Sequence, residues 1–235
     1  MNSAVNRQIL AVRGNTVLTE IREMVEEVDY TVQLSHRPVG RFSCSPWGVR
    51  KAVIGWLLLN GHIADMTQII SLEIREDSRS VLVEAEAAPA PAPYDAAPLT
   101  LKKARVAALS AMLEERSGLF KRTGGVHCAA LSDGNDFLAY EEDISRHAAV
   151  DKLAGACLEA GIPMQGRILV FSGRVPGDIV RMASTMGCAM IIARSAPTEL
   201  ACALAEELNI TLIGFARDAD FNIYTHPHRI TDLDN

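Results

Sequence analysis

The stretch "RILVFSGRVPGDIVRMASTMGCAMIIARSAPTELACALAEELNITLIGFAR", residues 167–217, decides the fold of this chain. Three of its segments, "ILVF", "AMIIA" and "TLIGF", are almost wholly apolar. Two segments of about a dozen residues with helical patterning separate them. Apolar strands that alternate with helices are typical of a sheet that helices cover on both faces. The stretch therefore predicts an α/β domain.

The sequence before this stretch extends the same domain. "GVHCAALSDGNDFLAYEED", residues 125–143, predicts a β-hairpin, because "SDGND" is a strong turn signal between two alternating segments. A helix over 145–160 follows, with Ser145 as its N-cap. The acidic run 141–143 is expected to end the second strand and to favour the positive end of that helix.

Residues 1–86 are predicted to form a smaller α+β region. "YTVQLSHRPVGRFSC" indicates two strands around a turn at "RPVG", and "IISLEIREDSRSVLVEAEA" indicates a second hairpin. "SPWGVRKAVIGWLLLNG" is predicted to be a helix, with Ser45 as N-cap, Pro46 in the first turn and Gly61 as its stop.

The alternating Ala-Pro segment 87–98 separates this region from the α/β domain. Such a sequence forms neither helices nor sheet ladders, so we expect an extended, mobile linker. Thr100 is predicted to cap a helix that runs through Phe120. The resulting organisation is an N-terminal region 1–86, a linker 87–98 and an α/β domain 99–235.

Composition narrows the classes of function. The chain has 235 residues, a formal net charge of -6 and a pI near 5.5, which argue against nucleic acid as a partner. The longest apolar run, 53–59, is too short to span a bilayer, and no signal-peptide pattern opens the chain. Five widely spaced cysteines without a C-x-x-C pair are typical of reduced thiols. We therefore predict a cytoplasmic protein without a membrane partner.

Polar residues gather where the predicted strands end. Ligands of such sheets bind beyond the carboxyl ends of the strands, against helix N-termini. "SGRVPGD" and "ARSAPTE" bring Ser172, Arg174, Arg194 and Ser195 to two of these junctions. His147 and Asp151, expected near the exposed start of the helix that begins at 145, mark a third. These junctions are the predicted site.

Several segments resemble the FdhD family, the accessory proteins needed for formate dehydrogenase activity. They are "TGGVHCAAL", "EEDISRHAAVDKLAG", "ILVFSGRVPGDIVRMASTMG" and "LNITLIGFARDADFNIYTHPHRI", which follow one another from Thr123 to Ile230. "SPWGVRKAVIGWLLLNGHI" is similar to the family's N-terminal helix, with Leu59 and Asn60 in place of Ser and Glu.

The resemblance implies a cytidine-deaminase-like three-layer domain, a homodimer and a role in sulfur relay. In that relay a cysteine desulfurase loads a persulfide, which passes to the molybdenum (or tungsten) bis-pterin guanine dinucleotide cofactor of formate dehydrogenase. Arg174 is expected to hold phosphate and His147 to donate a hydrogen bond to the ligand. The expected cofactor-binding residues are Ala216, Arg217, Asp218, Ala219, Asp220, Phe221, Ser172, Arg174, His147, Asp151 and Lys152.

The sequence departs from the family at the sulfur-carrying step. The family's persulfide cysteine lies in a C-x-x-C loop, whereas this chain has no cysteine between Cys44 and Cys128. Cys128, beside His127, is a weak candidate, and an ordinary strand thiol is the favoured interpretation. Cys44 is expected to be the better exposed thiol. Whether the chain is an enzyme stays open, and a cofactor-binding or guanine-nucleotide-binding module that passes no sulfur is the alternative.

Two other chemistries are not favoured. Deaminases of this fold need H-x-E and P-C-x-x-C, where this chain has "HAA" and "VPGD". The "HPH" at 226–228 offers too few ligands for a metal, so no metal site is predicted. An enzyme with unrelated chemistry remains a third hypothesis, for which no pair of nucleophile and base is visible.

Overall fold

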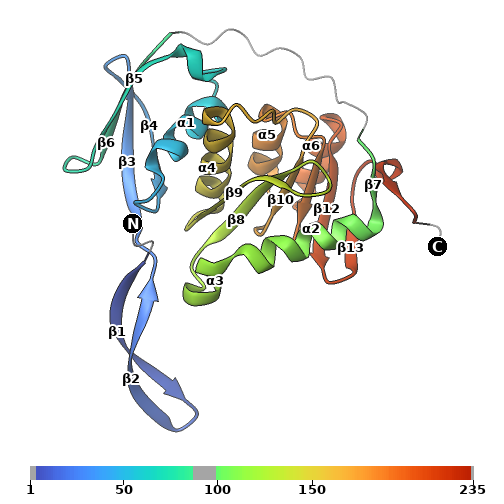
Figure 1. Ribbon diagram of the computed structural model, residues 1–235, viewed down its shortest axis with the longest axis horizontal. Helices are drawn as coiled ribbons and strands as arrows, with labels where there is room; N and C mark the ends of the chain where they lie inside the picture. Colours follow the sequence, from blue (N-terminus) through green and yellow to red (C-terminus); the bar gives the residue numbers. More distant parts are fainter. Residues whose placement is uncertain (1–3, 87–98, 234–235) are drawn as a thin grey trace.

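The computed structural model describes residues 4–86 and 99–233. Its centre is a six-stranded sheet in the order β13-β12-β11-β10-β8-β9 (Figure 1). β10, β11 and β12 are parallel to one another, whereas β8 and β13 run antiparallel to their neighbours β10 and β12. The strands are β8 (His127–Ser132), β9 (Phe137–Asp143), β10 (Ile168–Phe171), β11 (Met190–Ala193), β12 (Thr211–Arg217) and β13 (Asp220–Ile223).

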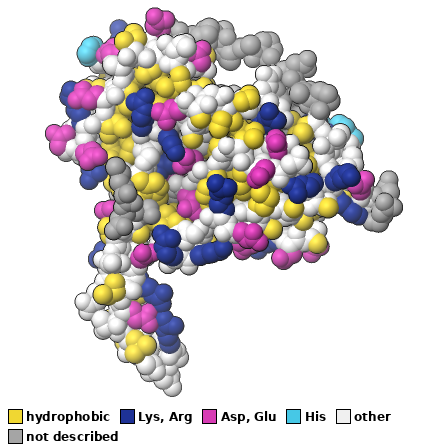
Figure 2. All heavy atoms as spheres, viewed as in Figure 1, with side chains coloured by type: hydrophobic (Ala, Val, Ile, Leu, Met, Phe, Trp, Pro, Cys, Tyr) yellow, Lys and Arg dark blue, Asp and Glu magenta, His cyan; other side chains and the backbone are white. Residues whose placement is uncertain are grey.

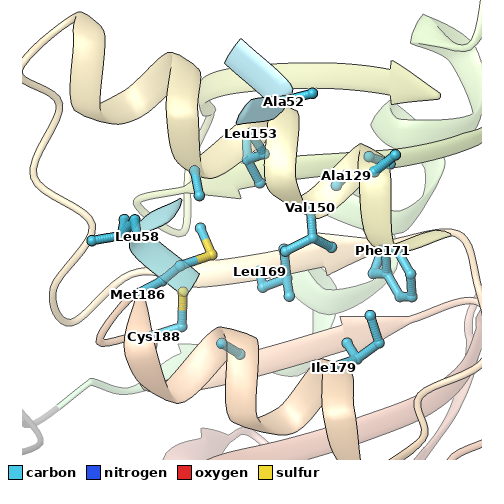
Figure 3. Packing of buried hydrophobic residues seen from close by; sticks show 14 of the residues in the cluster. Ala52, Leu58, Ala129, Val150, Leu153, Leu169, Phe171, Ile179, Met186 and Cys188 are labelled. Carbon is cyan, nitrogen blue, oxygen red and sulfur yellow. The ribbon is translucent and has the colours of Figure 1, made fainter. Parts of the chain in front are cut away.

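Helices cover both faces of this sheet. They are α2 (Lys103–Arg116), α4 (Arg146–Glu159), α5 (Gly177–Thr185) and α6 (Glu199–Glu207), and the short helix α3 (Gly118–Thr123) connects α2 to β8. Leu169 and Phe171 of β10 point to one face, where they pack with Val150 of α4 and Ile179 of α5 (Figure 3). The alternate residues Ile168 and Val170 point to the other face, in a second core with α2. This arrangement confirms the predicted α/β class.

The N-terminal region contains a second sheet and one long helix. The sheet has the order β4-β3-β6-β5. Its elements are β3 (Val28–Leu34), β4 (Arg37–Cys44), α1 (Val49–Leu59), the 3₁₀ turn η1 (Met66–Gln68), β5 (Ile69–Arg75) and β6 (Ser80–Ala85). α1 packs against α4, and a single hydrophobic core runs from Tyr30 and Ile54 to Leu153 and Phe171. The N-terminal sheet and the α/β body therefore share one interior.

Glycines set the closeness of the contact between α1 and α4. A Cβ atom added at Gly55 would lie 1.8 Å from the backbone oxygen of Asp151. A Cβ atom added at Gly155 would lie 1.9 Å from the backbone oxygen of Lys51. The two helix backbones touch where each lacks a side chain.

A buried charged cluster joins the same two regions. The ammonium of Lys152 lies 2.5 Å from a carboxylate oxygen of Asp143, and neither side chain is exposed. Ser45 donates its hydroxyl to Asp143 and accepts a hydrogen bond of 2.6 Å from Lys152. The Lys152 Nζ also lies 4.6 Å from the centre of the Trp47 ring. We call these four residues the seam cluster.

The seam cluster corrects one prediction and adds to another. Ser45 is not the N-cap of α1, because its hydroxyl is held by Asp143; Gly48 takes that position at φ 66°. The acids 141–143 do end β9, as predicted, but Asp143 also pairs with Lys152, and Glu141 pairs with Lys51 of α1 at 2.6 Å. The charges of this stretch fasten the N-terminal region to the α/β body.

The position of one turn and the start of one helix also differ from the predictions. "RPVG" lies in β4, and the turn is made by Ser35 and His36, both with positive φ. Thr100 caps no helix, because the next two residues form β7 (Leu101–Lys102), which pairs in parallel with β14 (Ile230–Thr231) after the 3₁₀ turn η2 (Pro227–Arg229). Ser145 is the N-cap of α4, and Gly61 follows α1 at φ 74°, as predicted.

An N-terminal hairpin stands apart from the body. β1 (Val5–Arg13) and β2 (Thr16–Met24) pair along their whole length and project away from the rest of the molecule (Figure 1). Within residues 4–86 and 99–233, β1 and β2 pair only with each other and with no third strand. We call this element the arm.

The predicted linker 87–98 lies outside the described residues. The three-part division of the chain therefore stays a prediction. In the part of the chain that the structure describes, no helix is long and apolar enough to cross a membrane.

Candidate functional site

A cleft of about 700 Å³ lies at the edge of the sheet where β10, β11 and β12 end and β8 begins. The floor comes from the ends of these strands, and the wall comes from α2 and α3. This is the edge at which the sequence placed a site. The lining residues are Leu113, Glu114, Ser117, Phe120, Lys121, Gly124, Gly125, Val126, His127, Cys128, Ile144, Ser172, Arg194, Ser195 and Arg217.

Positive charge dominates the cleft. Lys121, Arg194 and Arg217 line it with a single acid, Glu114. Glu114 accepts a hydrogen bond of 2.6 Å from Arg194, which positions that guanidinium. Arg217 donates its Nε to the backbone oxygen of Arg194, and among described residues its two terminal nitrogens have no partner. Space-filling atoms show Lys and Arg interspersed with Asp and Glu on the face that carries α2 and α3 (Figure 2).

Polar groups of β8 and β10 meet at the back of the cleft. The Ser172 hydroxyl accepts a hydrogen bond of 2.8 Å from the Cys128 N–H and lies 3.4 Å from Nδ1 of His127. Burial, with the charges of Arg146 and His147, lowers the pKa of His127. His127 is therefore mainly neutral at pH 7, and it offers a hydrogen-bonding nitrogen rather than a charge.

Cys128 lines the cleft as a protonated thiol. Its sulfur lies 2.9 Å from the Ser117 hydroxyl and 3.7 Å from a Glu142 oxygen. Burial raises its pKa, although hydrogen bonds from Ser117 and Tyr140 act in the opposite direction. A reactive cysteine needs a lowered pKa and access to solvent. The side chain is 3% exposed, so its surroundings favour the strand-thiol interpretation.

The other cysteines are no better placed. Cys44, expected to be exposed, is fully buried, and burial raises its pKa to about 12. Burial also raises the pKa of Cys157 to about 12 and that of Cys188 further. Cys202 is half-buried, with a pKa that burial raises as well.

The 216–221 turn contributes to the cleft through Arg217 alone. Ala216 is buried, and Phe221 packs against the core beneath α2. Asp218, Ala219 and Asp220 are exposed beyond the cleft, and Asp218 has φ 52°. Asp220 is the cross-strand partner of Arg217, so the two acids lie next to the cleft without lining it.

The predicted residues of α4 lie away from this cleft. His147 and Asp151 line a smaller hollow of about 320 Å³ with Trp56 and Asp178, where His147 Nε2 is 2.6 Å from an Asp178 oxygen. Asp151 is 4% exposed rather than at an exposed helix start, and burial, then Asp143, raises its pKa. Lys152 is in the seam cluster.

Arg174 is exposed and lines neither the cleft nor the smaller hollow. Of the residues that the sequence proposed for the cofactor, the structure thus brings only Ser172 and Arg217 into the cleft. Arg194 and Ser195, which the sequence placed at the same sheet edge, join them there.

Sequence reasoning missed the wall of the cleft. Glu114, Ser117, Phe120 and Lys121 come from α2 and α3, which were expected to form one continuous helix. Ser117 and Gly118 interrupt it, and "TGG" at 123–125 turns the chain into β8. That Ser-Gly break was the available signal. Within the described ranges, no group of three or more metal-ligating side chains is present.

Comparisons with known proteins agree with one another. The model of the FdhD/NarQ family matches residues 85–231. The sulfur carrier protein FdhD of Staphylococcus haemolyticus is 37% identical over 88% of this chain and 89% of its own. The protein of the same name from Staphylococcus aureus is 33% identical over 89% of this chain and 90% of its own.

A solved structure shares the fold. The crystal structure of a candidate formate dehydrogenase accessory protein from Desulfotalea psychrophila superposes with a TM-score of 0.82. The match covers 97% of this chain and 100% of the other, at 24% identity. The overall architecture is therefore one that is already known from experiment.

Proposed function

Because this chain belongs to the FdhD/NarQ family, we propose that it is an accessory protein of formate dehydrogenase. In this role it binds the molybdenum (or tungsten) bis-pterin guanine dinucleotide cofactor and supports its sulfuration or insertion. Its partners are formate dehydrogenase and a cysteine desulfurase, and it acts as a cytoplasmic homodimer.

The charge of the cleft is the observation that supports cofactor binding. A guanine dinucleotide carries diphosphate groups, and guanidinium groups bind phosphate oxygens through paired hydrogen bonds. Arg217 presents two terminal nitrogens, and Lys121 and Arg194 add charge on either side. The volume of about 700 Å³ falls in the usual range for sites that bind ligands of nucleotide size.

The residues present thus fit the anionic part of the cofactor. Arg217, Arg194 and Lys121 would hold the diphosphates, while Ser172 and Ser195 offer hydroxyls at the strand ends. When bound, the cofactor supplies the metal centre that the client enzyme needs. The residues of this chain bind and orient it.

One observation favours the second candidate, a binding module that passes no sulfur. Each of the five cysteines has a pKa that its surroundings raise. A sulfur-carrying thiol needs the opposite shift and an accessible position. The relatives are named sulfur carriers, whereas this chain has no thiol with these properties.

Replacing Arg217 tests the site. Arg217→Ala is expected to weaken binding of GDP, used as a probe for the guanine dinucleotide, by about 1.5–3 kcal/mol, because a charged hydrogen bond is lost. Isothermal titration calorimetry measures the affinity. Arg174→Ala is the matched control, since that side chain is an exposed arginine outside the cleft, and it should bind like the wild type. Equal losses in both variants would place the ligand elsewhere.

Intact mass distinguishes the two candidates. The protein is incubated with a cysteine desulfurase and cysteine, and a persulfide would add about 32 Da, the mass of one sulfur atom. We expect no stable adduct, and we expect a variant that lacks all five cysteines to keep its affinity for GDP. A reproducible adduct on Cys128 or Cys44 would instead establish a relocated sulfur carrier.

A further inference from the structure

The arm, β1 and β2, has two different faces. In a paired hairpin, directly opposed residues lie on the same face and successive residues alternate between faces. The pairs Arg7–Arg22, Ile9–Glu20 and Arg13–Thr16 therefore belong to one face. Glu20 binds both Arg13 and Arg22 there, at 2.9 and 2.8 Å. This face carries a network of charges, beside which Val5, Leu18 and Met24 are only 43%, 43% and 44% exposed.

The opposite face is apolar and bare. Leu10, Val12, Val17 and Ile21 lie on it and are 71%, 70%, 61% and 72% exposed. The remaining residues of this face are Thr19, opposite Leu10, and Gln8, Asn6 and Glu23 nearer the body. Glu23 is already paired with Arg122 of α3 at 2.8 Å. The distal half of this face thus has no charged side chain.

The arm cannot be covered by its own body, because it projects away from it (Figure 1). An isolated two-stranded hairpin is at best marginally stable in water. An arm with a bare apolar face therefore needs a surface that is present as long as the protein is folded. A second copy of the chain meets this condition, whereas a client that binds transiently does not.

Charge is consistent with a second copy. The contact in a two-fold dimer repeats with the roles exchanged, so each arm meets the same surface of the other copy. The bare face carries no charge that would have to be desolvated there, because Leu10, Val12, Val17 and Ile21 are uncharged and Arg13, Glu20 and Arg22 lie on the opposite face.

Area decides between two ways of pairing. A hairpin of nine-residue strands covers roughly 30 Å by 10 Å, or about 300 Å². Two arms stacked on each other would bury about 600 Å² in total, which is below the ~1,200–2,000 Å² of stable interfaces. Two arms that each lie on the other copy's body would bury about 1,200 Å², which reaches that range.

We propose that the Leu10–Val12–Val17–Ile21 face of the arm is a dimerisation surface, which lies against the body of a second copy in a reciprocal exchange of arms. This deepens the homodimer in the proposed function by assigning it a surface. The arm leaves the body beside the cleft. Glu23 pairs with Arg122, which follows the lining residue Lys121, and Val25 lies next to Gly125, which lines the cleft itself.

A charge on either face tests the assignment. Val17→Glu places a carboxylate on the bare face, and Thr16→Glu places it one residue away on the charged face, opposite Arg13. Sedimentation equilibrium of the full chain is expected to give twice the chain mass of 25.5 kDa for the wild type and for Thr16→Glu. Val17→Glu should weaken the dimer by at least about tenfold in dissociation constant.

Hydrogen exchange gives a readout that does not depend on a variant. The arm amides of the wild type should exchange more slowly as protein concentration rises, because the dimer covers the arm. A monomeric wild type, a Val17→Glu dimer of unchanged strength, or arm exchange that ignores concentration would each overturn the proposal.

GDP titration separates this proposal from the proposed function. GDP binding by a monomeric wild type would refute the arm contact and leave the function standing. An arm-dependent dimer that binds no GDP would refute the proposed function and leave the arm contact standing.

Discussion

Asp151 is a carboxyl group that the fold keeps from water. Burial, then the neighbouring Asp143, raises its pKa above that of an ordinary aspartate. Below the pKa of the unfolded chain, both states carry the proton. As the pH rises, the unfolded state releases the proton first, so ionisation favours unfolding. Asp151 therefore lowers stability above the unfolded-state pKa, and increasingly so up to its raised folded-state pKa.

Asp151→Asn is accordingly expected to stabilise the protein. Asn is similar in size and cannot ionise, so the variant should have a higher melting temperature than the wild type at pH 7. The difference should shrink toward pH 4, as measured by thermal denaturation across this range. Asp220→Asn, at an exposed acid, controls for the loss of a charge. A melting temperature that is lower at pH 7, or a gain that does not depend on pH, would contradict this account.

Helix α1 approaches α4 closely because neither helix has a side chain at the point where their backbones touch. Gly55→Ala would place a methyl group 1.8 Å from the Asp151 backbone oxygen, which no rotamer change can relieve. We expect a loss of about 1–3 kcal/mol or more in the free energy of unfolding, because the two backbones must separate. Urea denaturation measures it.

Gly118→Ala is the matched control for that substitution. The nearest atom to its added Cβ is the end of the Arg122 side chain at 3.8 Å. Its stability should change little. If Gly55→Ala were as stable as this control, the close approach of α1 and α4 would be wrong.

Elements of this protein could be predicted where the signal is local. The hairpin of β8 and β9 follows from "SDGND", and the alternation of β10 to β12 with α5 and α6 follows from apolar periodicity. The helix caps predicted at Ser45 and Thr100 were wrong, because partners far away in the sequence set the surroundings of both residues. Ser45 is held by Asp143, 98 residues later in the chain, and the residue after Thr100 pairs with Ile230.

The residues of the candidate site were likewise predictable only where the signal is local. Ser172, Arg194 and Ser195 could be placed because the ends of parallel strands meet at one edge of a sheet. The wall from α2 and α3 depends on how a helix crosses the sheet face, which no short pattern encodes. His147 and Arg174 are near the same edge in sequence terms, yet His147 lies in the smaller hollow beside Asp178, and Arg174 is exposed outside both cavities.

At the scale of the whole molecule, the shared core predicts cooperative unfolding. The N-terminal sheet and the α/β body have one interior, and the seam cluster places unexposed charges between them. Separating the two would expose apolar surface and break the hydrogen bonds that Ser45 makes with Asp143 and Lys152. Calorimetry should therefore show one transition whose calorimetric and van't Hoff enthalpies agree. Two resolved transitions would establish the N-terminal region as an independent unit.

Trp47 has a consequence for how this molecule can be observed. The chain has two tryptophans, Trp47 and Trp56, and both belong to the N-terminal region. The Trp47 ring lies directly over the Lys152 ammonium, which comes from the α/β body. Indole emission responds to nearby charge, so its wavelength reports whether this contact is closed. The protein thus carries an intrinsic optical label for the junction between its two halves, and separation of the two during unfolding can be followed from there without a dye.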